Sequence, residues 1–355
     1  MEQEVLIVGA GPTGLTTAIE LARRGVKTSI IDNRPGLSTL TRAVGITPAS
    51  LDLLRPSGVT KLLVQQGTKL ESIRIHYNSN VLSIPFSCTK NQSQYKYILA
   101  LPQLQLEAIL TQVLAKSGVH VQYNTSLTSF KQSHEGVVAT CDNGITEQYS
   151  YLIGADGINS TTREFIGFQF SGTDIEGKWS FADIDIDQSP ENTFNLTLLG
   201  KGRMYTAVPL SGSRVSVIAN FSDAVSALTS TTQVTVVHRQ ADFGIAVRQV
   251  NTYQKGNVLL AGDAAHCHSP VGGRGMNLGI ADAAHLARCI AGDNVTAYST
   301  KRHPVGSSTI ANCERFRKLL CSKHPLVRGA LTSTLNLTAK TNLLQRRLVD
   351  QLLYS

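Results

Sequence analysis

A short apolar run that leads directly into a glycine-rich turn constrains this chain more than any other feature. Residues 4–8 are mostly apolar and β-branched, which predicts a buried parallel strand. The glycines of the turn are Gly9, Gly11 and Gly14. Residues 15–24 then carry apolar side chains at helical spacing, and a second apolar run at residues 27–31 ends on Asp32. This order of strand, G-x-G-x-x-G, helix, strand and acid predicts a dinucleotide site.

Each residue of this turn has an expected task. Gly9 allows the tight turn, Gly11 lets the main chain approach a pyrophosphate, and Gly14 lets the helix pack close to the strand. The pyrophosphate is expected at the helix N-terminus, where free N–H groups favour an anion. Asp32 lies 18 positions after Gly14 (32 − 14), close to the ~20 expected of a carboxylate that binds a ribose. A chance glycine turn is the alternative, and the flanking strands and helix disfavour it.

A second glycine-bearing segment lies late in the chain. Residues 258–261 predict another buried strand, and Gly262 and Asp263 follow it. A loop with glycines at 272, 273 and 275 comes next, and residues 278–290 have helical periodicity. Main chain without side chains can approach a flat ligand closely, so this segment predicts a second part of the same site.

At this point the chain resembles the class A flavoprotein monooxygenases of the para-hydroxybenzoate hydroxylase type. Their second flavin motif runs G-D-A-A-H and, several residues later, P-x-G-G-x-G-M-N-x-G-x-x-D; this chain matches it from Gly262 through Asp282. Residues 151–163 contain the family's D-G-x-x-S-x-x-R signature, which serves the flavin and the nicotinamide pyrophosphate in relatives. The matching positions are Asp156, Gly157, Ser160 and Arg163. An ordinary Asp-Gly turn is the alternative for this segment.

The resemblance implies an α/β fold: a Rossmann-like FAD-binding domain, an inserted and mostly antiparallel β-sheet substrate domain, and C-terminal helices. The FAD-binding domain is expected to be discontinuous and to comprise residues 1–70, 100–171 and 250–300. The substrate domain is expected to comprise residues 71–99 and 172–249, with a hairpin-like strand pair at 72–77 and 81–84 and with alternating strands such as 203–208 and 214–219. Residues 301–355 are expected to form a basic helical segment. Residues 222–240 are rich in Ser and Thr, which predicts a trimmed roof over the substrate.

The implied activity is that of a FAD-dependent monooxygenase. NAD(P)H, with NADPH expected, would reduce the flavin, and a flavin hydroperoxide formed with O2 would hydroxylate an aromatic or polyketide-like molecule. Baeyer–Villiger-type oxygenation, tetracycline inactivation and an FAD-binding accessory protein without turnover remain alternatives. A flavin halogenase is disfavoured, because the W-x-W-x-I-P signature is absent and Trp179 is the only tryptophan.

The resemblance also implies which residues contact the cofactor. They are Gly9, Gly11, Thr13, Gly14, Asp32, Arg42, Gln103, Asp156, Asp263, Pro270, Gly273, Met276 and Asn277. Among these, Thr13, Arg42 and Gln103 would contact phosphate or ribityl groups and Asp263 the ribityl chain. The residues from Pro270 to Asn277 would line the isoalloxazine. Arg274 would add positive potential near the flavin or face solvent.

No catalytic side chain is assigned. Tyr205, His76 and Tyr77 lie on expected pocket strands, but strand aromatics more commonly pack in cores. Metal binding is not expected, since the His266-Cys267-His268 run lacks a third ligand at a familiar spacing. The six cysteines contain no C-x-x-C pair, which favours reduced thiols and a cytoplasmic location. A signal peptide is not expected, since the first strand begins within five residues of Met1, and no apolar run is long enough to predict a membrane span.

Charge is concentrated in the last 55 residues. Residues 301–355 hold ten Lys or Arg against two acids, whereas residues 1–300 hold 23 of each. Nucleic-acid binding is disfavoured because few aromatics are interleaved. An apolar stripe in this segment consists of Leu344, Leu348, Val349 and Leu352. The stripe favours a helix packed on its own protein over contact with another subunit or a membrane, and the oligomeric state stays open.

Overall fold

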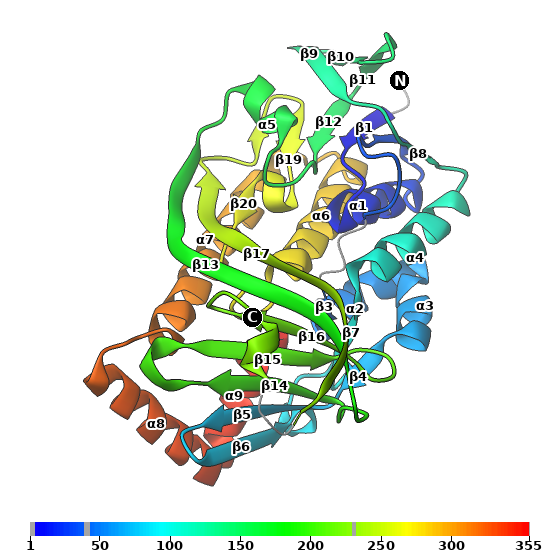
Figure 1. Ribbon diagram of the computed structural model, residues 1–355. Coiled ribbons are helices and arrows are strands. Elements are labelled where there is room, and N and C mark those ends of the chain that lie inside the picture. Colours follow the sequence, from blue (N-terminus) through cyan, green and yellow to red (C-terminus); the bar gives the residue numbers. More distant parts are fainter. Residues whose placement is uncertain (1–3, 39–42, 229–231, 355) are drawn as a thin grey trace.

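The computed structural model describes residues 4–38, 43–228 and 232–354. Figure 1 shows a parallel sheet with its helices in the upper half, a large curved sheet below it, and the last helices along the outer edge. The architecture therefore confirms the expected fold class: a Rossmann-like domain, an inserted sheet and C-terminal helices.

The parallel sheet has the strand order β18-β19-β12-β1-β2-β8. Its strands are β1 (Glu4–Val8), β2 (Lys27–Ile31), β8 (Val121–Gln122), β12 (Tyr151–Gly154), β18 (Gln254–Lys255) and β19 (Val258–Leu260). Every pairing between β19 and β8 is parallel, and β18 adds an antiparallel edge. The side chains of β19 are fully buried because helices and other sheets cover both faces. The strand order reverses direction at β1, the kind of position where open α/β sheets bind ligands.

Helices α1 (Pro12–Ala22), α4 (Gln103–Ala115) and α6 (Gly275–Ala291) pack on this sheet. Both predicted helices of the glycine motifs form, and each begins three residues earlier than predicted. Helices α1 and α6 approach each other closely. A Cβ on Gly279 of α6 would lie 2.3 Å from Oγ1 of Thr13 on α1, which is closer than two such atoms can pack. Glycine at 279 is therefore what allows the two helices to touch.

Two small sheets and three short helices surround this core. The antiparallel sheet β3-β7-β4 consists of β3 (Ala43–Ile46), β7 (Ile98–Pro102) and β4 (Thr68–Leu70). The outer sheet consists of β9 (Leu127–Ser133), β10 (Gly136–Cys141) and β11 (Thr146–Tyr149). The short helices are α2 (Pro48–Leu54), α3 (Val59–Gln66) and α5 (Thr161–Ile166).

The large sheet has the order β20-β17-β13-β16-β15-β14-β5-β6. Its strands are β5 (Ser72–Tyr77), β6 (Asn80–Pro85), β13 (Phe170–Ile186), β14 (Thr193–Leu198), β15 (Met204–Pro209), β16 (Arg214–Ala219), β17 (Val234–Val250) and β20 (His266–Cys267). The predicted pair forms as β5 with β6. The predicted strands at 203–208 and 214–219 form as β15 and β16, which pair with each other. Within this large sheet, among the described strands, only β14 and β5 pair in parallel. The sheet draws on both expected substrate-domain segments and adds β20; the division into domains stays a prediction.

The C-terminal segment forms helices α7 (Thr296–Leu320), α8 (Pro325–Lys340) and α9 (Asn342–Tyr354). Val349 and Leu353 of α9 are completely buried against β5 and β6, and Leu348 and Leu352 pack partly beside them. The predicted packing of this stripe on its own protein is confirmed. Within the described residues, no helix is both long enough and apolar enough to cross a bilayer.

Candidate functional site

Three sequence motifs meet where three parallel strands end. Gly9 follows β1, Asp156 comes two residues after β12, and Gly262 comes two residues after β19. Gly9 has φ +103°, and a Cβ there would lie 2.4 Å from the carbonyl oxygen of Ala155. A Cβ on Gly262 would lie 2.5 Å from Oγ1 of Thr13. Only glycine allows these approaches, so residues far apart in sequence form one contiguous main-chain surface.

Two helices aim uncapped N-termini at this surface. Helix α1 begins after Gly11 and helix α6 after Arg274, and within the described residues neither helix has a capping hydrogen bond from the side chain of its N-cap residue. A Cβ on Gly11 would meet no atom within 4 Å, so space is open in front of α1. Free N–H groups at a helix N-terminus attract anions and carbonyl oxygens.

Asp32 braces the glycine turn. Its Oδ2 accepts a 2.6 Å bond from the main-chain N–H of Ala10, and its Oδ1 accepts bonds from the main chain and Nε of Arg34 at 2.8 and 2.9 Å. Burial lowers the pKa of Arg34, but its contacts with Asp32 and Glu107 outweigh burial and raise it. A ribose hydroxyl at Asp32 would share these lone pairs with donors already in place.

Glu107, a residue that the motif analysis leaves out of the site, organises the neighbouring loop. It is completely buried on α4 and accepts bonds from Gln103 Nε2 at 2.8 Å, the main chain of Ser38 at 3.0 Å and Arg34 at 3.2 Å. Gln103 is thereby oriented at the start of α4. Arg42, an expected phosphate contact, lies outside the described residues.

Asp156 and Arg163 form a second brace. Both carboxylate oxygens of Asp156 accept bonds at the N-terminus of α5, from Ser160 Oγ at 2.5 Å and from the main chain of Thr162 at 3.0 Å. Arg163 is buried over the ring of Phe170 and donates to the carbonyl of Ala264 over 3.1 Å. The D-G motif is thus tied directly to the G-D-A-A-H motif.

The two aspartates of the late motif have opposite environments. Asp263 is exposed and has no hydrogen-bond partner within the part of the chain that the structure describes. Asp282 is completely buried and bonded to His266 Nε2 at 2.5 Å and to Arg302 Nε at 2.6 Å. Burial raises the pKa of Asp282, but the His266 and Arg302 contacts outweigh it and lower the pKa. Asp263 is free to accept ligand hydroxyls, whereas Asp282 joins α6 to α7.

The loop between β20 and α6 is folded back on itself. Gly273 has φ +63° and its N–H donates to the carbonyl of Pro270 over 3.0 Å. Asn277 uses its side chain within the protein: Oδ1 accepts bonds from Thr47 and Ser50, and Nδ2 donates to the carbonyls of Gly45 and Gly273. Asn277 therefore shapes this loop with its side chain and leaves only main chain for a ligand. Met276 packs partly against the core of the Rossmann-like domain.

Val271 joins the loop to the large sheet. It packs in one apolar cluster with Trp179 and Ile245, and Phe243 and Ile218 lie beside them. An apolar wall therefore stands between the loop and the sheet.

His268 and Ser269 are further residues that the motif analysis did not place in the site. His268 Nδ1 donates to the carbonyl of Ser269 over 2.8 Å, and its Nε2 is buried and has no hydrogen-bond partner among the described residues. Burial lowers the pKa of His268, which keeps the ring neutral. Ser269 Oγ is likewise buried without a partner. The sequence signal was present in the His-Cys-His run, but it was weighed only as a metal site.

Other candidates lie elsewhere. Arg274 is desolvated, which lowers its pKa, and its guanidinium donates to the carbonyl of Gln351 in the last turn of α9. Tyr77 bonds Asn336 of α8, and Tyr205 lies in the core of the large sheet. These tyrosines therefore have the packed role that strand aromatics commonly have.

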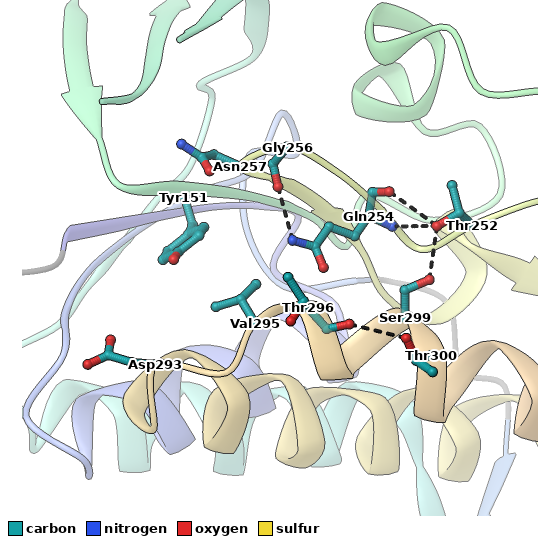
Figure 2. A pocket seen from close by; sticks show the side chains of 10 residues that line it. All are labelled: Tyr151, Thr252, Gln254, Gly256, Asn257, Asp293, Val295, Thr296, Ser299 and Thr300. Carbon is teal, nitrogen blue, oxygen red and sulfur yellow. Dashed lines mark hydrogen bonds between the residues drawn. The ribbon is translucent and has the colours of Figure 1, made fainter. Parts of the chain in front are cut away.

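A cavity of about 620 Å³ lies apart from this surface. Figure 2 shows its lining, with Tyr151 on one side and Thr252, Gln254 and Ser299 on the other. Tyr151 begins β12, so the cavity lies at the amino ends of the strands, opposite the motifs. Its polar groups bond one another, as Thr252 and Ser299 do at 2.9 Å.

The strand ends, the glycine surface and the two helix N-termini define a dinucleotide-binding α/β flavoprotein. The model of the "FAD binding domain" family matches residues 2–312, and the chain belongs to this family. It is 28% identical to 6-methylpretetramide 4-monooxygenase of Streptomyces rimosus, over 99% of the chain and 68% of that protein. It is also 28% identical to pentachlorophenol 4-monooxygenase of Sphingobium chlorophenolicum, over 89% of the chain and 64% of that protein. The chain spans about two thirds of the length of these relatives.

Among solved structures, p-nitrophenol 4-monooxygenase PnpA from Pseudomonas putida DLL-E4 superposes with a TM-score of 0.87 at 20% identity, covering 99% of both chains. This likeness confirms the fold. Family and relatives together make the chain a flavoprotein monooxygenase with FAD as cofactor.

The residues present fit FAD. The open space before Gly11 suits a pyrophosphate, the partnerless carboxylate of Asp263 suits a ribityl hydroxyl, and the uncapped start of α6 suits a flavin carbonyl. The orphaned Nε2 of buried His268 can accept a hydrogen bond from a ligand beside it.

Proposed function

We propose that this monooxygenase hydroxylates an aromatic or polyketide-like small molecule, with NADPH as reductant and O2 as the oxygen source. One observation carries the proposal: two uncapped helix N-termini and the free carboxylate of Asp263 meet at the carboxyl ends of β1, β12 and β19. FAD, when bound there, supplies the redox chemistry by which O2 gives one oxygen atom to the substrate and the other to water.

The chain's own residues have the following proposed tasks toward FAD. Gly9, Gly11 and Gly14 bring main chain to the pyrophosphate. Asp32, Gln103 and Asp156 hold the surrounding loops, and Asp263 orients the ribityl chain. Pro270, Gly273, Met276 and Asn277 form the loop that faces the isoalloxazine. Thr13 fills the space between Gly262 and Gly279, which supports a packing role instead of the expected phosphate contact.

The apolar cluster of Val271, Trp179 and Ile245 packs beside the loop that we expect to face the isoalloxazine, which supports an apolar, flat substrate. Apolar surroundings exclude water from reacting atoms and favour an apolar ring. The two relatives act on a pretetramide and on a chlorinated phenol, as their names state, which supports the same substrate class here.

Product analysis tests the activity. Protein reconstituted with FAD is incubated with NADPH or NADH and a panel of phenols and aromatic polyketides, and products are sought by mass spectrometry as a gain of one oxygen. We expect substrate-dependent NADPH oxidation and an oxygenated product. A bound flavin that neither nucleotide reduces would overturn the proposal in favour of an accessory protein without turnover.

A second measurement tests the cofactor residues separately. Trp179 is the only tryptophan and lies beside the loop, so its fluorescence is expected to fall as FAD is added to the apoprotein. Asp263→Ala is expected to weaken FAD binding about tenfold, the loss of one or two hydrogen bonds. Asp187→Asn, on the exposed end of the large sheet, is the matched control. Equal affinities for the two variants would remove Asp263 from the site.

A further inference from the structure

The turn between α7 and α8 carries exposed apolar side chains that neither the fold nor the FAD site uses. Phe316 and Leu319 lie on α7 with 38% and 36% of their surface exposed, and Leu326, in the first turn of α8, is 78% exposed. The inward side of α7 is built instead from residues such as Tyr298, Gly306 and Cys313, which are buried. The three apolar residues therefore serve no described core.

Cations flank these residues. Arg315, Lys318 and Lys323 are exposed, and no described salt bridge involves them. Residues 315–328 contain no acidic residue, and the nearest, Glu314, is engaged by Arg317 at 2.8 Å. We name Arg315, Phe316, Lys318, Leu319, Lys323 and Leu326 the α7–α8 corner. Figure 1 shows this turn at the outer left edge, away from the parallel sheet.

The positive charge of the α7–α8 corner favours an anionic partner. Residues 1–300 hold equal numbers of basic and acidic residues, and residues 301–355 are strongly basic, so a second copy of this chain offers no acidic excess to the corner. A polyanion without apolar surface would leave Phe316, Leu319 and Leu326 in water. An anionic lipid bilayer satisfies both features, because cations meet headgroups while apolar side chains enter the acyl boundary.

We propose that the α7–α8 corner docks this protein on anionic lipid membranes. Lys318 and Lys323 contact headgroup phosphates, and Phe316, Leu319 and Leu326 insert between the lipids. The contact is peripheral and reversible, since it uses a few side chains at one corner. The FAD site and its expected activity do not depend on it.

Vesicle flotation tests this proposal with the full chain. Vesicles of phosphatidylcholine alone are compared with vesicles that contain one quarter phosphatidylglycerol, at low salt and in 0.5 M NaCl. Wild type is expected to float with the anionic vesicles at low salt only. Lys318→Glu with Lys323→Glu, and Phe316→Ser with Leu319→Ser and Leu326→Ser, are each expected to reduce binding tenfold or more.

The matched control is Val138→Ser with Lys131→Glu. These residues pair across β10 and β9 and are exposed at the opposite end of the molecule. The control is expected to bind vesicles as wild type does, and unchanged thermal unfolding confirms that every variant is folded.

Three outcomes would overturn the proposal. Wild type does not bind anionic vesicles. The serine variant binds as wild type while the glutamate variant does not, which would indicate a surface for polyanions such as nucleic acid. Light scattering shows that the serine variant alone turns a dimer into a monomer without vesicle binding, which would make the corner a self-association surface.

Discussion

Arg163 donates a hydrogen bond from Nη1 to the main-chain carbonyl of Ala264 over 3.1 Å. The two residues belong to different motifs, one after β12 and one after β19. A second bond of 2.7 Å runs from Nη2 to the carbonyl of Ile158. The Arg163 guanidinium thus links two main-chain segments at the edge of the parallel sheet where FAD is expected.

Replacing this arginine is expected to loosen both motifs. Arg163→Lys keeps the charge but cannot make two forked bonds, so a buried carbonyl loses its donor at a cost of about 1–3 kcal/mol. We expect a lower free energy of unfolding in urea and weaker FAD retention. Arg23→Lys, at the C-terminal end of α1, is the control, because the Arg23 side chain bonds Glu20 alone among the described residues and lies near the surface. An unchanged free energy of unfolding in Arg163→Lys would show that the hydrogen bonds of Arg163 do not stabilise the fold.

Two glycines should separate folding from cofactor binding. Gly279→Ala places a methyl group 2.3 Å from Thr13 Oγ1 and is expected to cost about 1–3 kcal/mol of stability. The double variant with Thr13→Ala removes the clashing atom and should recover most of that loss in a double-mutant cycle. Gly11→Ala meets nothing within 4 Å, so the apoprotein should stay stable.

The Gly11→Ala methyl group would nevertheless occupy space expected for the pyrophosphate. Its FAD affinity, measured by the quenching of Trp179, is therefore expected to fall well below that of wild type. Normal FAD affinity in Gly11→Ala would argue that the pyrophosphate lies elsewhere.

The buried contacts of Asp282 are expected to make the free energy of unfolding fall at acidic pH. The His266 and Arg302 contacts, which outweigh burial, lower the pKa of Asp282 below the unfolded value of about 3.9. Its stabilisation is therefore complete above that value and is lost as the pH falls through the folded pKa. Asp282→Asn should lose about 3–5 kcal/mol at neutral pH, since it leaves Arg302 buried without its carboxylate. The variant should also lose part of the acid dependence of urea unfolding below about pH 4, while Asp187→Asn should not.

Arg274 should hold the end of α9. Its guanidinium donates to the carbonyl of Gln351, where the unpaired carbonyls of a helix C-terminus favour a cation. Arg274→Ala is expected to speed hydrogen exchange in the last turn of α9 several-fold, and Arg347→Ala, exposed on the same helix, should leave it unchanged. Equal exchange in both variants would contradict a clamp by Arg274.

Strand and helix periodicity predicted much of the fold from sequence. The runs at residues 4–8, 27–31 and 258–261 became β1, β2 and β19, because apolar runs with few polar breaks are stable only when buried on both faces. The glycine spacing predicted both helix starts to within three residues. Boundaries shifted because Pro12 and Gly275 can begin a helix although they are not apolar.

The motifs that form the site were predictable from sequence. Which of their side chains bond within the protein and which stay available to a ligand was not predictable. Sequence spacing placed Asp32, Asp263 and Asn277 in one cofactor site without showing which side chains stay free. Tertiary contacts decide which side chains stay available to a ligand. The side chain of Asn277 accepts hydrogen bonds from Thr47 and Ser50, more than 200 positions away, whereas the carboxylate of Asp263 has no partner among the described residues. Hydrogen-bond partners so distant in sequence leave no periodic trace.

The sequence by itself determined the dinucleotide class and the strand–turn–helix units, because these depend on local spacing of glycine, acid and apolar residues. The resemblance of its motifs to a known family implied FAD as the cofactor. Only the tertiary structure decided that Arg163, Asp282 and Arg274 hold motifs and helices together, and that the α7–α8 corner stays exposed while the α9 stripe is buried. Burial and pairing depend on how the elements pack, and packing brings together residues that no local pattern connects.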